Sequence, residues 1–195
     1  CCDVYFAASY PVHTVLSGPA GGVVGAFESA SELGIDRIIT FDMGGTSTDV
    51  CLVDGAPTWT TDSDMDGLPL RVPVIDIFTV GAGGGSVARR DVGGSLRVGP
   101  ESAGASPGPA CYGNGGQKPT VTDANLSLGR LRPDRFLGGE MSLDAGSADG
   151  VVGRLAESFG FGSLETAAGI LEVVEASMVR AIKVVSVERG YDPSS

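Results

Sequence analysis

The sequence of 195 residues has little histidine, tryptophan or cysteine. It contains one histidine, His13, one tryptophan and four cysteines. A single imidazole excludes sites that need several histidines, and no nucleophile-elbow sequence accompanies it for serine–histidine hydrolysis. The cysteines are two adjacent residues, Cys1 and Cys2, and two isolated ones, Cys51 and Cys111, which fits neither a disulfide framework nor a zinc site. We therefore expect a reducing compartment and a cytoplasmic protein.

Basic residues and long apolar runs are also scarce. Thirteen Lys and Arg against 24 Asp and Glu give a net charge of −11, which argues against broad binding to nucleic acid phosphates. The charge does not argue against one anionic ligand held by backbone amides. No apolar stretch approaches the roughly 18 residues of a membrane span, and no signal peptide is visible. We expect neither a nucleic acid partner nor a membrane.

Glycine, by contrast, is abundant, with 31 glycines beside 11 prolines. The apolar fraction of 42% is too high for a disordered chain, and no repeat suggests collagen. A chain of this length can bury one core or form a lobe of something larger. Two glycine-rich segments each follow a predicted strand: the GGTS turn at residues 44–47 and the GAGGG run at residues 81–85.

The spacing of apolar residues predicts an α/β fold without a linker that would divide it. Residues 11–16 are predicted to be extended. Gly34 suits a left-handed helix cap, Asp54 and Gly55 suit a hairpin turn, and Asp123 suits the start of a helix. Helices are predicted at residues 22–33, 86–90, 123–131, 145–159 and 164–189, and strands at residues 37–41, 50–53, 57–61 and 70–80.

The GGTS turn has the composition of an anion-binding turn. Gly44 and Gly45 let the backbone turn with no side chain in the way, and amides in such a turn form a concavity for anions. A neighbouring carboxylate repels bare phosphate but suits phosphate that carries magnesium, usually through water. From the turn alone, a second interpretation is equally open: a simple hairpin in which the acids only accept hydrogen bonds from backbone amides. The flanking acids are Asp42 and Asp49, and the hydroxyl donors are Thr46, Ser47 and Thr48.

The order of these segments resembles the second lobe of the superfamily that includes actin, sugar kinases and heat-shock chaperones. There, a small-residue hinge helix, here residues 17–26, precedes a strand that carries an Asp-x-Gly-Gly phosphate turn. The resemblance implies a ribonuclease H-like or actin-like ATPase lobe, with a mixed sheet flanked by helices and a second glycine turn that opens a helix. One departure is Thr46, where the chaperones usually have a third glycine.

A more specific resemblance covers nearly the whole chain. Five segments in the same order resemble the A-type subunit of the hydantoinase/oxoprolinase family: residues 16–26 (LSGPAGGVVGA), 42–49 (DMGGTSTD), 80–86 (VGAGGGS), 99–113 (GPESAGASPGPACYG) and 119–126 (PTVTDANL). Because members are much longer, the resemblance implies a fragment that ends before the last strand of the lobe. It divides the partial domain 1–195 into residues 11–92, with the hinge helix and phosphate-turn sheet, a glycine-rich insertion at 93–143, and a helical part at 144–195.

The family resemblance implies ATP-dependent hydrolysis of a cyclic amide C–N bond, as in hydantoin or 5-oxoproline. Phosphorylation of the amide carbonyl oxygen turns that oxygen into a leaving group, so that water can open the ring. ATP and magnesium are the implied cofactors. The implied site residues are the catalytic acids Asp42 and Asp49, with Asp42 holding magnesium through water, and the phosphate-binding residues Gly44, Gly45, Thr46, Ser47, Gly83, Gly84 and Gly85.

Two other functions stay open at this point. Within the same family, an ATP-dependent ketone carboxylase uses a similar subunit, and outside it a non-catalytic actin-like module binds nucleotide as a scaffold. The implied partners are the small cyclic amide and a B-type hydantoinase subunit or domain, and a homo-oligomer is left open. We expect the isolated fragment to be inactive and to bind ATP weakly.

Three local patterns have simpler explanations. Residues 81–86 approach the dinucleotide fingerprint G-x-G-x-x-G, but a helix at residues 86–90 is too short for a crossover helix. Cys111 has no evident histidine or helix N-terminus to lower its thiol pKa, so a buried structural thiol is predicted rather than a nucleophile. His13 is predicted to be a surface or packing residue.

Overall fold

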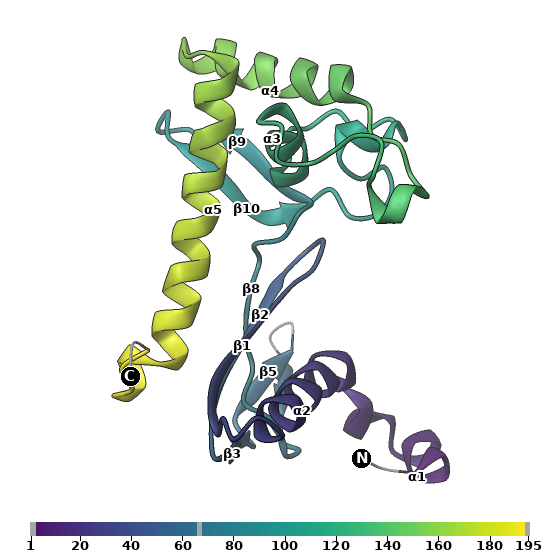
Figure 1. The fold of residues 1–195 in the computed structure, drawn as a ribbon, viewed down its shortest axis with the longest axis vertical. Coiled ribbons are helices and arrows are strands. Elements are labelled where there is room, and N and C mark those ends of the chain that lie inside the picture. Colours follow the sequence, from purple (N-terminus) through teal and green to yellow (C-terminus); the bar gives the residue numbers. More distant parts are fainter. Residues whose placement is uncertain (1–2, 66–67, 194–195) are drawn as a thin grey trace. The chain divides into compact units, whose positions relative to one another are not determined.

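The computed structural model describes residues 3–65 and 68–193, which form two compact units. The first unit comprises Cys1–Asp42, Asp49–Phe78 and Ile182–Ser195, and the second comprises Met43–Thr48 and Thr79–Ala181. Each unit is built from separated stretches, so no single linker marks the division. Both combine helices with small sheets, which makes the fold mixed α/β. Figure 1 follows the elements along the chain.

The first unit begins with three helical segments, α1 (Val4–Ser9), the 3₁₀ helix η1 (Pro11–Thr14) and α2 (Ser17–Ser31). The predicted extended run at residues 11–16 is therefore wrong. Proline has a backbone angle suited to the first helical turn, and the Thr14 hydroxyl donates back to the Pro11 carbonyl at 2.7 Å. The following helix begins at Ser17 rather than at residue 22. Gly34, just after α2, has the predicted left-handed conformation, with φ of 72°.

The sheet of the first unit is arranged around one central strand. Strand β2 (Thr48–Asp54) pairs with β1 (Arg37–Met43), β3 (Ala56–Pro57) and β8 (Phe78–Val80). The two predicted strands at residues 37–41 and 50–53 are confirmed, each slightly longer than expected. Gly55, with φ of 72°, forms the predicted turn between β2 and β3. Helix α2 packs on this sheet (Figure 1), and the buried core contains Val23, Cys51, Val53 and Ile75.

The chain between β3 and β8 forms two further short hairpins instead of long strands. Strand β4 (Trp59–Thr60) pairs with β7 (Val74–Ile75), and β5 (Ser63–Met65) pairs with β6 (Leu68–Leu70). The predicted continuous strand at residues 70–80 is therefore interrupted. Pro73 lies in the break between β6 and β7, because proline has no amide for a sheet ladder.

The second unit contains an antiparallel pair, β9 (Ser86–Arg90) and β10 (Leu96–Ser102). The short helix predicted at residues 86–90 is wrong, and so is the expectation that the GAGGG run opens a helix. Long-range pairing decides the outcome, since Ala88, Arg89 and Arg90 lie opposite Val98, Arg97 and Leu96 of β10. Pairing with β10 satisfies the backbone groups that a helix would have satisfied internally.

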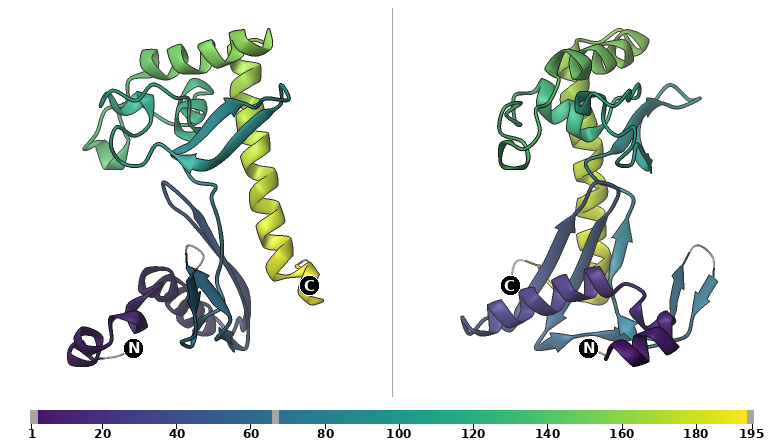
Figure 2. Two further views of the ribbon diagram at one scale, coloured as in Figure 1. Left: turned by 180° about the vertical axis from the view of Figure 1, so that it is seen from behind. Right: turned by 90° about the vertical axis from the view of Figure 1, so that its right-hand side faces the viewer.

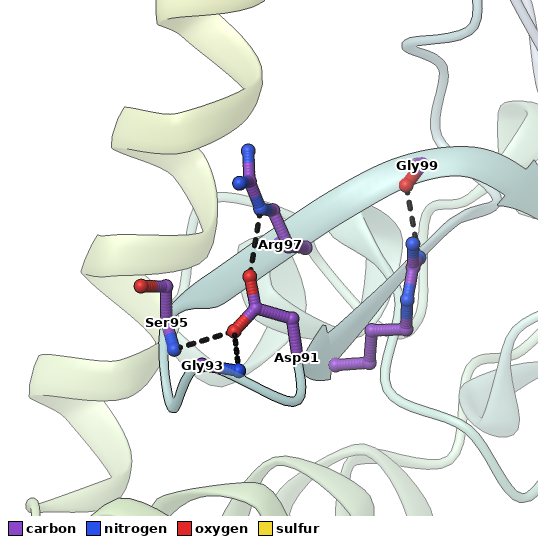
Figure 3. A network of polar contacts seen from close by, with 6 residues as sticks. Asp91, Gly93, Ser95, Arg97 and Gly99 are labelled. Carbon is purple, nitrogen blue, oxygen red and sulfur yellow. Dashed lines mark hydrogen bonds and ion pairs between the residues drawn. The ribbon is translucent and has the colours of Figure 1, made fainter.

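The loop between β9 and β10 is closed by one carboxylate (Figure 3). Asp91 accepts hydrogen bonds from the amides of Gly93 and Ser95 at 2.9 and 2.8 Å, and the Arg97 guanidinium donates to it at 3.0 Å. These contacts, the Ser95 amide first, lower the pKa of Asp91 below its ordinary value. The turn chemistry of Asp91 thus fixes the hairpin, and Asx-type turns of this kind are a local alternative to helix.

The helices of the second unit enclose its core. Helix α3 (Val121–Ser127) follows the 3₁₀ helix η2 (Ala110–Tyr112), and α4 (Ala145–Phe159) follows η3 (Leu137–Gly139). Helix α5 (Ser163–Val185) belongs to the second unit as far as Ala181 and is followed by η4 (Val187–Arg189). Figure 2 shows α4 crossing the N-terminal end of α5. The core residues are Ala82, Ala88, Ala110, Val121, Ala124, Val151, Val152, Ala167, Ile170, Leu171 and Val174.

The predicted helix at residues 145–159 is confirmed, and the other two predictions need adjustment. Helix α3 begins at Val121 with Thr120 as its cap, and Asp123 is the third residue of a capping box rather than the cap itself. The last helix ends at Val185, and η4 and Gly190 follow. In the part of the chain that the structure describes, no helix combines the length and apolarity of a membrane span.

Candidate functional site

The GGTS turn, which connects β1 to β2, is fastened to the GAGGG run by its carbonyl groups. The Gly44 amide donates to the Ser47 carbonyl at 2.9 Å and closes the turn. The Gly44 carbonyl accepts from the Gly84 amide at 3.1 Å, and the Gly45 carbonyl accepts from the Gly85 amide at 2.6 Å. All these residues belong to the second unit. The two glycine segments, about 40 residues apart in the sequence, therefore form one hydrogen-bonded structure.

These contacts fix the direction of two amides in the turn. The cis peptide bonds among the described residues precede Pro100 and Pro107, so the peptides around Gly45 are trans. In a trans peptide the carbonyl and the next amide point in opposite directions. The amides of Gly45 and Thr46 therefore point away from the GAGGG run, and both residues are exposed. Two adjacent amides of this kind can hold an anion.

The three hydroxyls predicted as donors differ in their surroundings. The Thr48 hydroxyl is fully buried and donates to the Ala82 carbonyl at 2.5 Å, so it is committed to the protein. The Thr46 hydroxyl lies 3.4 Å from that of Ser102 at the surface. Ser47 is half-buried. Thr46 and Ser47 therefore remain the hydroxyls that can assist the turn amides.

The GAGGG run uses its amides inside the protein. The Gly83 amide donates to the Ser86 hydroxyl at 2.8 Å, while those of Gly84 and Gly85 hold the turn. A β-carbon at Gly83 would lie 2.8 Å from the carbonyl oxygens of Gly44 and Gly45, closer than real contacts. The run is therefore glycine-rich because it packs against the turn. The amides of Gly83, Gly84 and Gly85, which the family resemblance implies as phosphate donors, thus have protein acceptors in this structure.

The two flanking acids, by contrast, belong to the first unit and share one hollow there. The hollow has a volume of about 470 Å³ and is lined mainly by α2 and β1, with Asp42 and Asp49 among its lining residues. Asp42 is exposed and lies beside α2, since a β-carbon at Gly22 would be 3.9 Å from its Oδ2 atom. Asp49 is half-buried. The structure thus brings the two predicted catalytic acids to the same cavity.

The acids at this hollow are the pair Asp42 and Asp49. Within residues 3–65 and 68–193, no cluster of three or more His, Cys, Asp or Glu side chains is placed to bind a metal ion. Magnesium typically takes one or two carboxylates, together with waters and substrate phosphates. The donor set of Asp42 and Asp49 therefore fits a magnesium ion that arrives with a phosphorylated ligand.

Two residues in the first turn of α3 make buried hydrogen bonds to other residues of the second unit. Asp123 is fully buried and accepts from the amides of Cys111 and Thr120 at 2.8 and 3.0 Å and from the Thr120 hydroxyl at 2.8 Å. The Thr-x-x-Asp spacing is a signal for this capping box. Thr122 donates to the Gly84 carbonyl across 38 positions of the sequence. No local pattern announces that contact.

The two described cysteines are structural. Cys51 and Cys111 are fully buried free thiols. Burial, with the nearby Asp123 carboxylate, raises the pKa of Cys111. Burial and the Asp76 carboxylate raise the pKa of Cys51 to about 11, against the opposing effect of Arg189. Because the thiolate is the nucleophile, neither thiol is activated, and the prediction of a buried structural thiol at Cys111 is confirmed.

Comparison with known proteins agrees with the five sequence segments. The hydantoinase/oxoprolinase family model matches residues 3–195. The chain belongs to this family. The caprolactamase subunit alpha of Pseudomonas jessenii is 48% identical over 184 residues, which cover 93% of this chain and 26% of that protein. The acetone carboxylase beta subunit of Xanthobacter autotrophicus is 37% identical over 185 residues, with coverage of 93% and 26%.

Solved structures of the family support the fold. The nucleotide-free structure of acetone carboxylase, from work on ATP-dependent acetone carboxylation, matches with a TM-score of 0.86 and 35% identity over 93% of this chain and 26% of that chain. The ATP-dependent caprolactamase of P. jessenii matches with a TM-score of 0.73 and 48% identity over 84% of this chain and 24% of that chain. The chain thus spans about a quarter of the length of these relatives.

Proposed function

We propose that this chain is the phosphate-binding part of an ATP-dependent enzyme that hydrolyses a cyclic amide. The observation that carries the proposal is the pair of outward amides at Gly45 and Thr46, held by the GAGGG run. An anion that replaces water at these amides gains directed donors that need no reorganisation. In this proposal, the amides of Gly45 and Thr46 are the groups that bind the phosphates of ATP.

The GGTS turn would hold the terminal phosphates of ATP. The amides of Gly45 and Thr46 would bind phosphate oxygens, with the hydroxyls of Thr46 and Ser47 as further donors. Gly44 keeps the turn closed through its own amide, and Gly83, Gly84 and Gly85 support it. Phosphoryl transfer depends mainly on positioning and on neutralisation of charge, with little covalent chemistry by the protein. An amide cradle without a nucleophile suits that task.

Asp42 and Asp49 would bind the magnesium ion that accompanies the phosphates. They stand two positions before Gly44 and two positions after Ser47 in the sequence. Asp42 would accept hydrogen bonds from water on the ion, and Asp49 would orient the ion or a water molecule. Bound magnesium would neutralise charge on the transferred phosphoryl group. The net charge of −11 makes such a counterion important for a polyanionic ligand.

The reaction requires activation of a poor electrophile. Transfer of the terminal phosphoryl group to the ring carbonyl oxygen releases ADP and makes that oxygen a leaving group. Water then adds to the carbon of the phosphorylated amide, and cleavage of the ring C–N bond leaves an acyl phosphate with a free amine. A second water hydrolyses the acyl phosphate, and the products are the open amino acid and phosphate. This chain's part is to aim the phosphoryl group. A lactam or a 5-oxoproline-type ring is the favoured substrate, because caprolactamase shares 48% of aligned residues with this chain.

Ketone carboxylation is the second candidate. The acetophenone carboxylase gamma subunit of Aromatoleum aromaticum is 40% identical over 184 residues, and the acetone carboxylase beta subunit is also a relative. Carboxylation needs ATP to activate an enolate or bicarbonate, so the same phosphate turn serves it. Because these relatives and the caprolactamase protein are named as subunits, we also propose that the full-length protein works with a partner subunit.

The test is phosphate release from ATP by the full-length protein with its partner subunit. We expect ε-caprolactam, 5-oxoproline or hydantoin to stimulate release and to be consumed in equal amount. Stimulation only by acetone or acetophenone with bicarbonate would replace hydrolysis by carboxylation. Slow release that ignores every substrate would support a nucleotide-binding scaffold, and absence of ATP binding would refute the phosphate site.

A further inference from the structure

Thr122, in the first turn of α3, makes a two-point contact with the GAGGG run. Its backbone amide and its hydroxyl both donate to the Gly84 carbonyl, each at 2.8 Å. The side chain is buried, with an exposed fraction of 7%. A β-carbon at Gly84 would lie 2.9 Å from the Thr122 hydroxyl oxygen, so the glycine is what admits this contact. Thr122 itself is remote from the GGTS turn in the sequence.

The contact continues into the turn through two peptide groups. The Gly84 carbonyl and the Gly85 amide belong to one peptide, and that amide donates to the Gly45 carbonyl at 2.6 Å. The Gly45 carbonyl and the Thr46 amide belong to the next peptide, and that amide points outward. Hydrogen bonds in such a series polarise one another. The Thr122 hydroxyl is therefore the first donor of a series that ends at the Thr46 amide.

A parallel series ends at the neighbouring amide but contains only backbone groups. The Ser86 amide donates to the Gly83 carbonyl at 3.0 Å, and the Gly84 amide donates to the Gly44 carbonyl at 3.1 Å. The peptide of Gly44 then presents the Gly45 amide. Since this series contains no side-chain donor, a substitution cannot remove a donor from it selectively. The Thr122 hydroxyl is thus a side-chain donor that a substitution can remove from the series that ends at the Thr46 amide.

We propose that Thr122 is a positioning residue for nucleotide phosphate, which acts by orienting and polarising the Thr46 amide through Gly84, Gly85 and Gly45. The inference rests on the proposed function, because it concerns the same phosphate turn. Thr122 touches no ligand in this account. Its effect falls on ground-state and transition-state binding alike, so it changes the KM for ATP more than kcat.

The test compares three variants of the full-length protein. Thr122→Val keeps the branched shape and the backbone donor but removes the hydroxyl, and Thr122→Ser keeps the hydroxyl. The matched control is Thr166→Val, because Thr166 is also buried and its hydroxyl has no hydrogen-bond partner among the described residues. The readouts are KM and kcat for ATP and hydrogen–deuterium exchange of peptides that cover residues 81–86.

We expect Thr122→Val to raise the KM for ATP by about 3- to 10-fold, the effect of one hydrogen bond, with kcat changed less than about twofold. Exchange at Gly84 and Gly85 should become faster, Thr122→Ser should restore both values, and Thr166→Val should change neither. An unchanged KM and exchange in Thr122→Val, or equal changes in Thr166→Val, would overturn the inference. If Thr122→Val does not fold, Thr122→Ser becomes the test. Because serine keeps the hydroxyl, a raised KM for ATP in Thr122→Ser would also overturn the inference about Thr122.

The exchange readout separates the two proposals. If the wild-type protein neither binds nor cleaves ATP, the proposed function fails, whereas faster exchange in Thr122→Val alone would still support the orienting role of Thr122. If ATP is cleaved and the variant exchanges as the wild type does, the proposed function stands and the inference about Thr122 fails.

Discussion

The GGTS turn and the GAGGG run are similar in composition but use their backbones in opposite ways. The turn accepts hydrogen bonds through the carbonyls of Gly44 and Gly45 and presents two amides to solvent. The run donates its amides to protein acceptors and presents none of those at Gly83, Gly84 and Gly85. A glycine-rich segment thus indicates close backbone approach, and only its hydrogen-bond partners tell whether a ligand or the protein itself is approached.

The steric surroundings show the same contrast. A β-carbon at Gly45 would meet no atom within 4 Å, whereas one at Gly83 would lie 2.8 Å from backbone atoms of the turn. In the turn, the space beside Gly45 is open. In the run, glycine is required by the folded chain alone. Substitutions in the two segments should therefore fail for different reasons.

The largest expected effect concerns the acid that precedes the turn. In the full-length protein, Asp42→Ala should lower ATP turnover by at least about 100-fold, because a group that orients a metal-bound water is lost. The free energy of unfolding should stay within about 0.5 kcal/mol, since Asp42 is exposed. Phosphate release and chemical denaturation measure the two effects.

The matched control for that substitution is Asp62→Ala. Asp62 is an exposed acid of the same unit, in an ion pair with Arg71 at the surface. It should leave turnover unchanged, because exposed ion pairs contribute little. Normal turnover in Asp42→Ala, or equal losses in both variants, would contradict the assigned role.

The second prediction separates the two glycine segments directly. Gly83→Ala should lower the free energy of unfolding by about 1–3 kcal/mol, the range for overpacking, and should weaken ATP binding as the turn shifts. Gly45→Ala should leave stability within about 1 kcal/mol and still raise the KM for ATP, since its methyl group occupies the ligand side. Urea denaturation and steady-state kinetics on the same preparations provide the comparison. The contrast breaks down if Gly45→Ala unfolds the protein or if Gly83→Ala is neutral.

The smallest effect is expected at the end of the turn. Thr48→Val removes the buried hydroxyl that donates to the Ala82 carbonyl and should cost about 1 kcal/mol of stability. This contact joins the turn to the run but involves neither the Gly45 amide nor the Thr46 amide. The KM for ATP should therefore change less in Thr48→Val than in Gly45→Ala. A larger change in KM for Thr48→Val than for Gly45→Ala would show that the hydroxyl, and not the amides, serves the ligand.

The sequence predicted those elements whose signals are local. Strands β1 and β2, the turn at Gly55 and helix α4 follow from apolar periodicity and turn residues within a few positions. The segment Ser86–Arg90 was predicted as a helix and forms a strand, because its conformation depends on β10 and on the loop that Asp91 closes. The pairing of β9 with β10 cannot be predicted from the five residues of β9 alone.

The candidate site divides in the same way. The acid-flanked turn was predicted from its own residues, and the structure places Asp42 and Asp49 at one hollow. The hydrogen bonds of the Gly84 and Gly85 amides to the turn and the contact of Thr122 could not be predicted, since their partners lie about 40 positions away in the sequence. The glycines in the sequence indicated which segments approach other backbone closely. The long-range hydrogen bonds between the two glycine segments show which of their amides have protein acceptors.

A crystal structure of the full-length protein with magnesium and a non-hydrolysable ATP analogue would show whether the amides of Gly45 and Thr46 bind phosphate. We expect phosphate oxygens within about 3.2 Å of the amide nitrogens of Gly45 and Thr46, with the amides of Gly84 and Gly85 still bound to the turn carbonyls. Phosphate seated on the amides of Gly83–Gly85, or bound with no contact to Gly45 and Thr46, would contradict it.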